Sequence, residues 1–386
     1  MELRKKFVEI FGEGGDIREY FAPGRVNLIG EHTDYNGGHV FPCALTIGTY
    51  ACARLREDGV LRFYSENFPK QGVLETAIDD TVYHKELSWS NYPRGVIQAA
   101  AEMGYAIDRG MDILYYGTIP NSSGLSSSAS IEILTGYVLR DLFGFDFDGV
   151  TNALIGQRAE NRFIGVNCGI MDQFAISMGR KDSAIFLDTA TLQYEYAPIE
   201  LSGVRIVIMN TNKKRGLGDS KYNERRAECE QALAELKKVL PISSLGELDE
   251  IQFEANITAI SSPICRKRAR HAVYENQRTL QAVAALRSGD LAGFGELMNA
   301  SHISLRDEYE VTGTELDTLV SAAWQQEGVI GARMTGAGFG GCAVSLVKEE
   351  CVPAFIEGVG ASYLAAIGYE ATFYVVEIGD GPTRIS

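Results

Sequence analysis

A glycine- and serine-rich segment in the first third of the sequence sets the strongest constraint on the fold. Residues 118–130 read TIPNSSGLSSSAS, follow an apolar β-like run, and lead into a segment with helical periodicity that begins at Ile131. A helix N-terminus presents unpaired backbone N–H groups and the positive end of the helix dipole, which together bind anions. One Ser or Thr is enough to cap a helix, yet four serines occur here in five residues. The segment therefore predicts a loop that binds nucleotide phosphates.

The other glycine patterns exclude several nucleotide-binding classes. The sequence holds no G-x-x-x-x-G-K-S/T, so the serine-rich loop would hold ATP without the lysine of a Walker-type loop. Residues 334–344 read MTGAGFGGCAV and contain G-x-G-x-x-G, but residues 342–347 are typical of a strand, whereas a dinucleotide site requires a helix there. We interpret this segment as a loop between two strands that approaches a ligand closely, or as a tight structural hairpin. The protein-kinase patterns H-R-D and D-F-G are also missing from the sequence.

Length and charge narrow the class of protein. A chain of 386 residues is long enough for two domains, and 45% hydrophobic residues is typical of folded globular proteins. A net charge of −15 opposes binding to nucleic acids and to anionic membranes. We find no apolar stretch that approaches 18 residues and no apolar leader, so we expect a cytoplasmic protein without a membrane partner. Seven scattered cysteines favour free thiols over disulfides or a zinc site.

Short strand-like runs and longer helical patterns predict an α+β fold. The strands are expected at residues 204–209, 342–347 and 372–378, and the helices at residues 222–240 and 267–287. The first helix should bury one stripe, formed by Ala227, Leu233, Leu236 and Leu240. We expect a boundary near residues 190–200, which divides the chain into domains 1–195 and 196–386.

The densest polar segment is residues 22–38, APGRVNLIGEHTDYNGG. Arg25, Glu31, His32 and Asp34 are interleaved there with apolar residues, which a solvated loop does not explain. Each sugar hydroxyl both donates and accepts hydrogen bonds, so carboxylates and His suit a polyhydroxylated ligand. Arg25 supplies five donors in a fixed geometry for a phosphate or a carboxylate.

Residues 24–36, GRVNLIGEHTDYN, resemble the signature of the galactokinase family. Residues 124–129 and 336–341 resemble the second and third motifs of the wider GHMP superfamily, which also holds homoserine, mevalonate and phosphomevalonate kinases. Residues 167–174 and 301–309 are similar to galactokinase stretches as well. The order and spacing of these segments agree with the family over nearly the whole chain.

The resemblance implies a fold and a reaction. The implied fold is the α+β, two-lobed GHMP kinase fold, with an N-terminal mixed-sheet α/β lobe (ribosomal protein S5 domain 2-like) and a C-terminal ferredoxin-like α+β lobe. Its last strand would pack with either lobe. Galactokinases transfer the γ-phosphoryl group of ATP to the C1 hydroxyl of α-D-galactose, giving galactose 1-phosphate and ADP, with Mg²⁺ as cofactor. The resemblance thus implies a monomer whose partners are small molecules, galactose and MgATP.

The resemblance also implies the roles of individual residues. It places Asp172 beside the C1 hydroxyl, as a base or as an orienting group, and places Arg25 next to it to offset charge on the transferred group. The sugar-binding positions are Glu31, His32, Asp34, Gly169 and Tyr222. The ATP-binding positions are Pro120, Gly124, Leu125, Ser126, Ser127, Ser128, Ala129, Gly336 and Gly338, with Trp89 and Tyr92 flanking the adenine. The positions that would hold Mg²⁺ are Ser128 and Glu160.

Two alternatives stay open at this point. Another sugar-1-kinase, acting on N-acetylgalactosamine or arabinose, would share these motifs. A catalytically silent sensor of galactose and ATP belongs to a different class, and such sensors typically have an altered glycine-serine loop. Because residues 124–130 are intact and Asp172 is present, the sequence favours an active enzyme.

Overall fold

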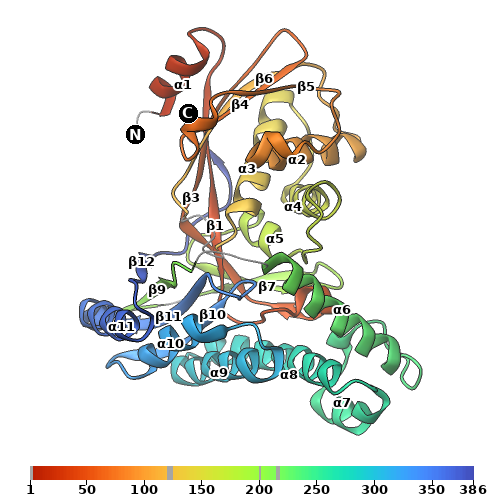
Figure 1. Ribbon diagram of the computed structural model, residues 1–386, viewed down its shortest axis with the longest axis vertical. Coiled ribbons are helices and arrows are strands. Elements are labelled where there is room, and N and C mark those ends of the chain that lie inside the picture. Colours follow the sequence, from red (N-terminus) through yellow and green to blue (C-terminus); the bar gives the residue numbers. More distant parts are fainter. Residues whose placement is uncertain (1–2, 120–124, 200, 214–217) are drawn as a thin grey trace.

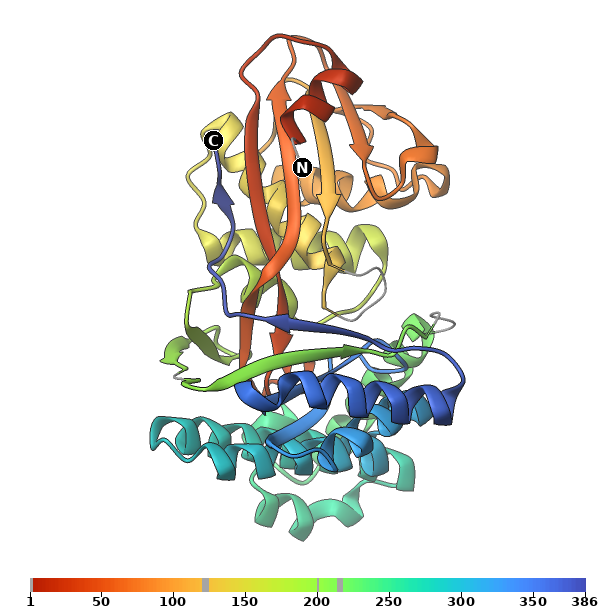
Figure 2. The same ribbon diagram turned by 90° about the vertical axis from the view of Figure 1, so that its left-hand side faces the viewer.

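The protein has two stacked lobes, with the N-terminal part of the chain above and most of the C-terminal part below (Figures 1 and 2). The computed structural model describes residues 3–119, 125–199, 201–213 and 218–386. A small sheet of order β2-β7-β8 lies where the lobes meet, with bounds β2 (His39–Val40), β7 (Ser183–Asp188) and β8 (Tyr194–Pro198). The short 3₁₀ or π-helical segments are η1 (Asp34–Asn36), η2 (Pro69–Gln71), η3 (Lys85–Ser90), η4 (Ala159–Ile164), η5 (Leu245–Glu247), η6 (Ile257–Ala259), η7 (Leu305–Tyr309) and η8 (Glu349–Cys351).

The upper lobe is built on a mixed six-stranded sheet of order β13-β1-β3-β6-β4-β5, in which β4 and β6 pair in parallel. The strands are β1 (Arg18–Asn27), β3 (Pro42–Leu55), β4 (Val60–Ser65), β5 (Leu74–Ala77), β6 (Met111–Gly117) and β13 (Thr383–Arg384). One face is covered by α2 (Asn91–Glu102), α3 (Ser127–Phe143), α4 (Gly149–Arg158) and α5 (Met171–Ser177), while α1 (Leu3–Phe11) packs on the other (Figure 1). The long strands β1 and β3 reach down to the lower lobe (Figure 2).

The lower lobe is built on an antiparallel sheet of order β10-β11-β9-β12. Its strands are β9 (Val204–Asn210), β10 (Val329–Thr335), β11 (Cys342–Lys348) and β12 (Thr372–Val376). Its helices are α6 (Gly218–Leu236), α7 (Glu250–Asn256), α8 (Pro263–Arg287), α9 (Leu291–Ser304), α10 (Gly313–Trp324) and α11 (Val352–Ile367). The lobe follows a β-α-β-β-α-β order with extra helices in the first crossover, which is the expected ferredoxin-like arrangement. The predicted strand-loop-strand at the second glycine segment is confirmed as β10 and β11.

The two predicted helices exist, with different bounds and one different face. Helix α6 ends at Leu236 rather than at residue 240, and its buried residues include Cys229, Ala232 and Leu236. The predicted stripe was wrong at Ala227, which is exposed, because the buried face follows the 3-4 spacing from Cys229. Helix α8 begins at Pro263, four residues before the prediction, because the Ser262 side chain accepts the N–H of Cys265 as a cap.

The C-terminal segment runs through both lobes. Strand β12 pairs with β9 in the lower sheet, Ile378 bridges to Leu45 of β3, and β13 pairs with β1 in the upper sheet. The strand expected at residues 372–378 therefore belongs to the lower sheet, and the residues after it return to the upper one (Figure 2). The division of the chain at residues 195 and 196 stays a prediction.

One segment differs from the expectation that no stretch resembles a membrane span. The helical segment Glu349–Ile367 has the length and the mean hydropathy, 1.2, that a span needs. Its buried residues Val352, Phe355, Val359 and Tyr363 recur every three or four positions and belong to the core of the lower lobe. This packing accounts for those four positions, but 22% of the apolar window is buried, and Leu364 is 43% exposed.

Candidate active site

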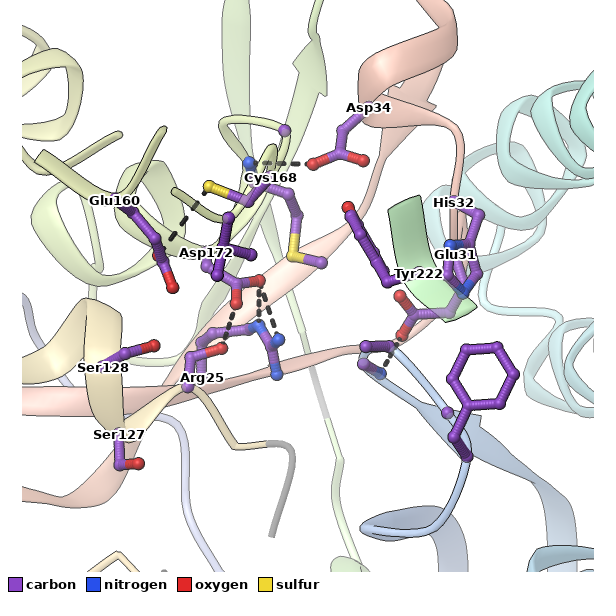
Figure 3. A pocket seen from close by; sticks show the side chains of 18 of the residues that line it. Arg25, Glu31, His32, Asp34, Ser127, Ser128, Glu160, Cys168, Asp172 and Tyr222 are labelled. Carbon is purple, nitrogen blue, oxygen red and sulfur yellow. Dashed lines mark hydrogen bonds and ion pairs between the residues drawn. The ribbon is translucent and has the colours of Figure 1, made fainter. Parts of the chain in front are cut away.

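A pocket between the lobes brings together most of the predicted site residues (Figure 3). Its lining includes Arg25, Glu31, His32, Asp34, Ser126, Ser127, Ser128, Glu160, Gly169, Asp172, Tyr222, Gly336 and Gly338. These residues come from β1 and the segment after it, the start of α3, η4, the start of α5 and the loop before it, α6, and the loop between β10 and β11. Pro120 and Gly124 lie outside the described residues.

Arg25 and Asp172 form an ion pair on one side of the pocket. Arg25 Nε lies 2.8 Å and Nη2 lies 2.7 Å from Oδ1 of Asp172, which stands in the first turn of α5. Ser126 Oγ donates to the other oxygen, Oδ2. The Arg25 side chain is buried, whereas the Asp172 side chain is 30% exposed. Because Arg25 is held by a charge-assisted contact, the carboxylate of Asp172 has a fixed orientation toward the pocket.

Asp34 also lines the pocket, and its carboxylate lies against Gly169 (Figure 3 shows Asp34). Asp34 Oδ2 accepts the backbone N–H of Met171 at 3.3 Å. A Cβ added at Gly169 would overlap the Asp34 carboxylate, so this position requires glycine for space. Burial, the largest cause, and the charge of nearby Asp172 raise the pKa of Asp34 to about 6.

Glu31 and His32 connect the polar segment to the lower lobe. Glu31 Oε1 accepts the backbone N–H of Gly336 at 2.7 Å, which joins the signature segment to the second glycine loop (Figure 3). His32 has a left-handed backbone, φ 62°, and its ring lies 5.6 Å from the ring of Tyr222. Burial lowers the pKa of His32 to about 3, so this ring is neutral at pH 7. Neutral imidazole offers the pocket one donor or one acceptor nitrogen.

The serine-rich loop enters a helix, as the sequence predicts. Helix α3 begins at Ser127, and the preceding Ser126 has a left-handed backbone, φ 60°. Ser127 and Ser128 line the pocket at the N-terminal end of this 17-residue helix, where backbone N–H groups favour an anion. Leu125 and Ala129 are buried in hydrophobic cores instead, so their predicted part in ATP binding has no direct geometric support and stays a prediction.

A second, more apolar cavity adjoins the first on the side of α3. Its lining includes Trp89, Tyr92 and Tyr115, and it shares Ser127 and Ser128 with the main pocket. The Trp89 ring meets the Tyr115 ring edge to face at 5.8 Å. A flat aromatic base suits such a wall, next to a loop that binds its phosphates.

Carboxylates gather near the predicted metal position. Glu160 Oε2 accepts from Gln173 Nε2 at 2.7 Å, and the same amide nitrogen donates to Glu132 Oε2 at 3.0 Å. Burial, the largest cause, and Asp172 raise the pKa of Glu160 to about 7, whereas a hydrogen bond from Ser128 opposes the rise. Among the described residues no group of three or more His, Cys, Asp or Glu side chains is arranged to hold a metal ion. A cation at Ser128 and Glu160 would thus need further oxygen ligands from a phosphate or water.

Sequence reasoning missed several residues that support the site. Glu132 and Gln173 are fully buried below Glu160, and Arg333 is fully buried next to Glu31. The available signal was a charged residue inside an apolar run, as in IEIL around Glu132. Such a residue is rarely buried unless it is paired.

The fold and the pocket together define a small-molecule kinase of the GHMP class. The family model "GHMP kinases N terminal domain" matches residues 91–180, and "GHMP kinases C terminal" matches residues 282–363. A solved mevalonate kinase structure shares this fold, with a TM-score of 0.65 at 18% identity over 94% of this chain and 99% of that chain.

Within that class, the chain is most specifically similar to galactokinases. The galactokinase galactose-binding signature matches residues 5–55. The galactokinase of Clostridium beijerinckii is 60% identical over 99% of this chain and 98% of its own length, and that of Clostridium acetobutylicum is 60% identical over 100% and 98%. The crystal structure of Lactococcus lactis galactokinase complexed with galactose has a TM-score of 0.97 at 54% identity over 98% of each chain. The chain belongs to the galactokinase family, so the family and the fold predicted from its motifs are confirmed.

Proposed function

We propose that this protein transfers the γ-phosphoryl group of ATP to the C1 hydroxyl of α-D-galactose, giving galactose 1-phosphate and ADP. The observation that carries the proposal is the ion pair of Asp172 and Arg25, which faces the same pocket as Asp34 and the N-terminus of α3. One pocket thereby offers a place for a sugar hydroxyl, a proton acceptor and a phosphate.

The sugar would bind on the side of Asp34, Glu31, His32 and Tyr222. Asp34 and Glu31 accept hydrogen bonds from sugar hydroxyls, and neutral His32 adds a donor or acceptor next to the Tyr222 ring. Gly169 leaves room for Asp34 to stand at the wall. The similar Lactococcus lactis galactokinase forms a crystalline complex with galactose, which supports this choice of sugar.

Asp172 would act on the C1 hydroxyl. Oδ1 is held by Arg25, so Oδ2, which accepts from Ser126, is the oxygen that the sugar hydroxyl would use. The C1 oxygen forms a bond to the γ-phosphorus while the bond from that phosphorus to the β,γ-bridging oxygen breaks, ADP leaves, and the hydroxyl proton passes to Asp172. Arg25 offsets negative charge on the transferred group. Because phosphoryl-transfer transition states are loose, orientation of the hydroxyl contributes alongside proton removal.

The nucleotide would bind across both cavities. Backbone N–H groups at the start of α3 and in the loop that contains Gly336 and Gly338 face the phosphates, and the base lies against Trp89 and Tyr92. Ser128 and Glu160 would hold Mg²⁺, since a hard cation prefers oxygen ligands and the raised pKa of Glu160 indicates that a positive charge would be favourable there. When bound, Mg²⁺ neutralises charge on the phosphates.

A coupled ADP-release assay across a panel of monosaccharides tests the proposal, with ³¹P NMR to identify the product. Galactose should be the preferred substrate, and its product should carry phosphate on C1. Preference for N-acetylgalactosamine or arabinose would assign the related sugar-1-kinase instead, and binding of galactose and ATP without turnover would assign a sensor. Light scattering should give the mass of a monomer.

A further inference from the structure

A fully buried arginine lies next to Glu31, one of the residues of the proposed sugar site. Arg333 belongs to β10, just before the loop that starts at Gly336, and its side chain is 0% exposed. Arginine keeps its charge in proteins and is rarely buried without partners. The proposed reaction assigns no role to Arg333, so its contacts need another explanation.

Those contacts place the guanidinium between two carboxylates. Arg333 Nη1 donates to the backbone oxygen of Asn27 at 2.9 Å and lies 3.5 Å from Glu31 Oε1. Its Nε donates to Ser301 Oγ at 3.1 Å. Its Nη2 lies 3.9 Å from Glu275 Oε1 and makes no hydrogen bond to the part of the chain that the structure describes. Glu31 and Glu275 are both buried, so Arg333 is the positive charge that they share.

Glu275, on α8, holds the backbone of the signature segment. Its Oε1 accepts the backbone N–H groups of Gly30 at 3.0 Å and Glu31 at 3.3 Å. Burial alone would raise the pKa of Glu275, but Arg278, His271 and Arg333 hold it at about 2. Glu275 is therefore a charged acceptor that fixes the main chain at Gly30 and Glu31.

The side chain of Glu31 is fixed by residues of β10 and of the loop that follows it. Its Oε1 accepts the hydroxyl of Thr335 at 3.1 Å and the N–H of Gly336 at 2.7 Å, besides its contact with Arg333. These contacts all use Oε1, while the carboxylate lines the pocket and points toward the glycine loop in Figure 3. Contacts at one oxygen fix the direction in which the other oxygen points.

We propose that Arg333, together with Glu275, is a positioning residue that orients the Glu31 carboxylate so that Oε2 meets a hydroxyl of the bound sugar. The proposal rests on the proposed function, because it assumes that a sugar occupies this side of the pocket. It makes sugar affinity depend on a residue that never touches the sugar.

A double-mutant cycle with Glu31→Gln and Arg333→Met tests this dependence. Galactose affinity is measured by calorimetry without nucleotide, and the KM values for galactose and ATP are measured separately. Each single variant should weaken galactose binding by about tenfold and leave the KM for ATP within about twofold, since a hydrogen bond to a charged group is worth about that much. The double variant should bind galactose no more weakly than the single variant that has the lower affinity. Both substitutions remove the same linkage between Arg333 and Glu31, so their effects should not multiply. Multiplied effects, about a hundredfold in the double variant, would overturn the proposal.

Two more variants separate positioning from general stability. Arg333→Lys keeps the charge but loses the planar fork, so it should fold, bind galactose with intermediate affinity, and show the same non-additivity with Glu31→Gln. Arg54→Met is the matched control, because Arg54 is also a buried arginine paired with a buried carboxylate, and its Nε donates to Asp112 Oδ2 at 2.8 Å in the upper sheet. This variant should lose thermal stability and keep its galactose affinity. An equal loss of galactose affinity in Arg54→Met would overturn the proposal, whereas failure of the proposed function would appear in the unsubstituted protein as absent galactose binding.

Discussion

The raised pKa of Asp34 gives a prediction with two opposite consequences. In the folded protein this pKa rises from 3.8 to about 6, through burial and then the charges of Asp172 and Glu31, against the N–H groups of Met171 and Tyr35. The folded state thus binds the proton more tightly than the unfolded state. The stability that this group contributes is fully present below pH 3.8 and is lost as the pH rises through 6. Asp34→Asn removes this loss, so the variant should gain stability relative to the parent as the pH increases.

The size of the expected stability change follows from the pKa shift of Asp34. A rise from 3.8 to about 6 corresponds to about 3 kcal/mol in total, at 1.36 kcal/mol for each pKa unit. About half of this change falls between pH 5 and pH 8, and partial exposure of Asp34 reduces it, so we expect a relative gain of about 1 kcal/mol over that interval. In contrast, the KM for galactose should rise at least about tenfold, because the substitution removes a charged acceptor of hydrogen bonds.

Urea denaturation of the ligand-free protein at pH 5 and pH 8 measures the first effect, and steady-state kinetics measures the second. Asp146→Asn is the matched control, because Asp146 is exposed and its substitution should leave both quantities unchanged. The reasoning would be refuted if the stability difference between Asp34→Asn and the parent did not change with pH. An unchanged galactose KM would remove Asp34 from the sugar site.

Gly169→Ala should fold but lose galactose affinity at least about tenfold, because its Cβ would displace the Asp34 carboxylate; calorimetry that finds normal binding would contradict the steric argument. Ser128→Ala and Glu160→Gln should each raise the Mg²⁺ concentration needed for half-maximal rate, since each removes an oxygen ligand, while galactose binding without nucleotide stays normal. Unchanged Mg²⁺ titrations would leave both residues with a structural role. Asp172→Asn should lower the single-turnover rate by about 10²–10⁴-fold with galactose affinity nearly intact, and a rate close to the parent's would eliminate Asp172 as the base.

Local sequence patterns predicted the parts of this fold that depend on short-range order. The serine-rich loop before α3, the strands on both sides of the second glycine loop, and helix α8 all follow from periodicity and turn chemistry. The face of α6 was misjudged at Ala227, because several apolar residues in that helix compete for the buried stripe. Only packing against the rest of the lower lobe selects the face of Cys229 and Leu236.

The site was predictable only as far as a family pattern places distant residues together. Arg25 and Asp172 are 147 positions apart, and no periodicity connects them. Arg333 contacts Glu31 across 302 positions, and its position in an apolar strand gave no motif to recognise. Gly169 shows the same limit, because the need for glycine arises from Asp34, which approaches it from another segment. Contacts of this kind are properties of the tertiary structure.

The electrostatics of the pocket fit a site that its substrates complete. Burial raises the pKa of Asp34 to about 6 and that of Glu160 to about 7, because each carboxylate is enclosed next to other negative charges. Arg25 Nε and Nη2 contact Asp172, whereas the pKa of Asp34 and that of Glu160 stay raised. Buried negative charges that repel one another destabilise a fold, so these carboxylates lower the free energy of unfolding. Under the proposed function, sugar hydroxyls would relieve Asp34 and a cation would relieve Glu160, and part of the stability that these two groups cost the fold would be recovered as binding free energy.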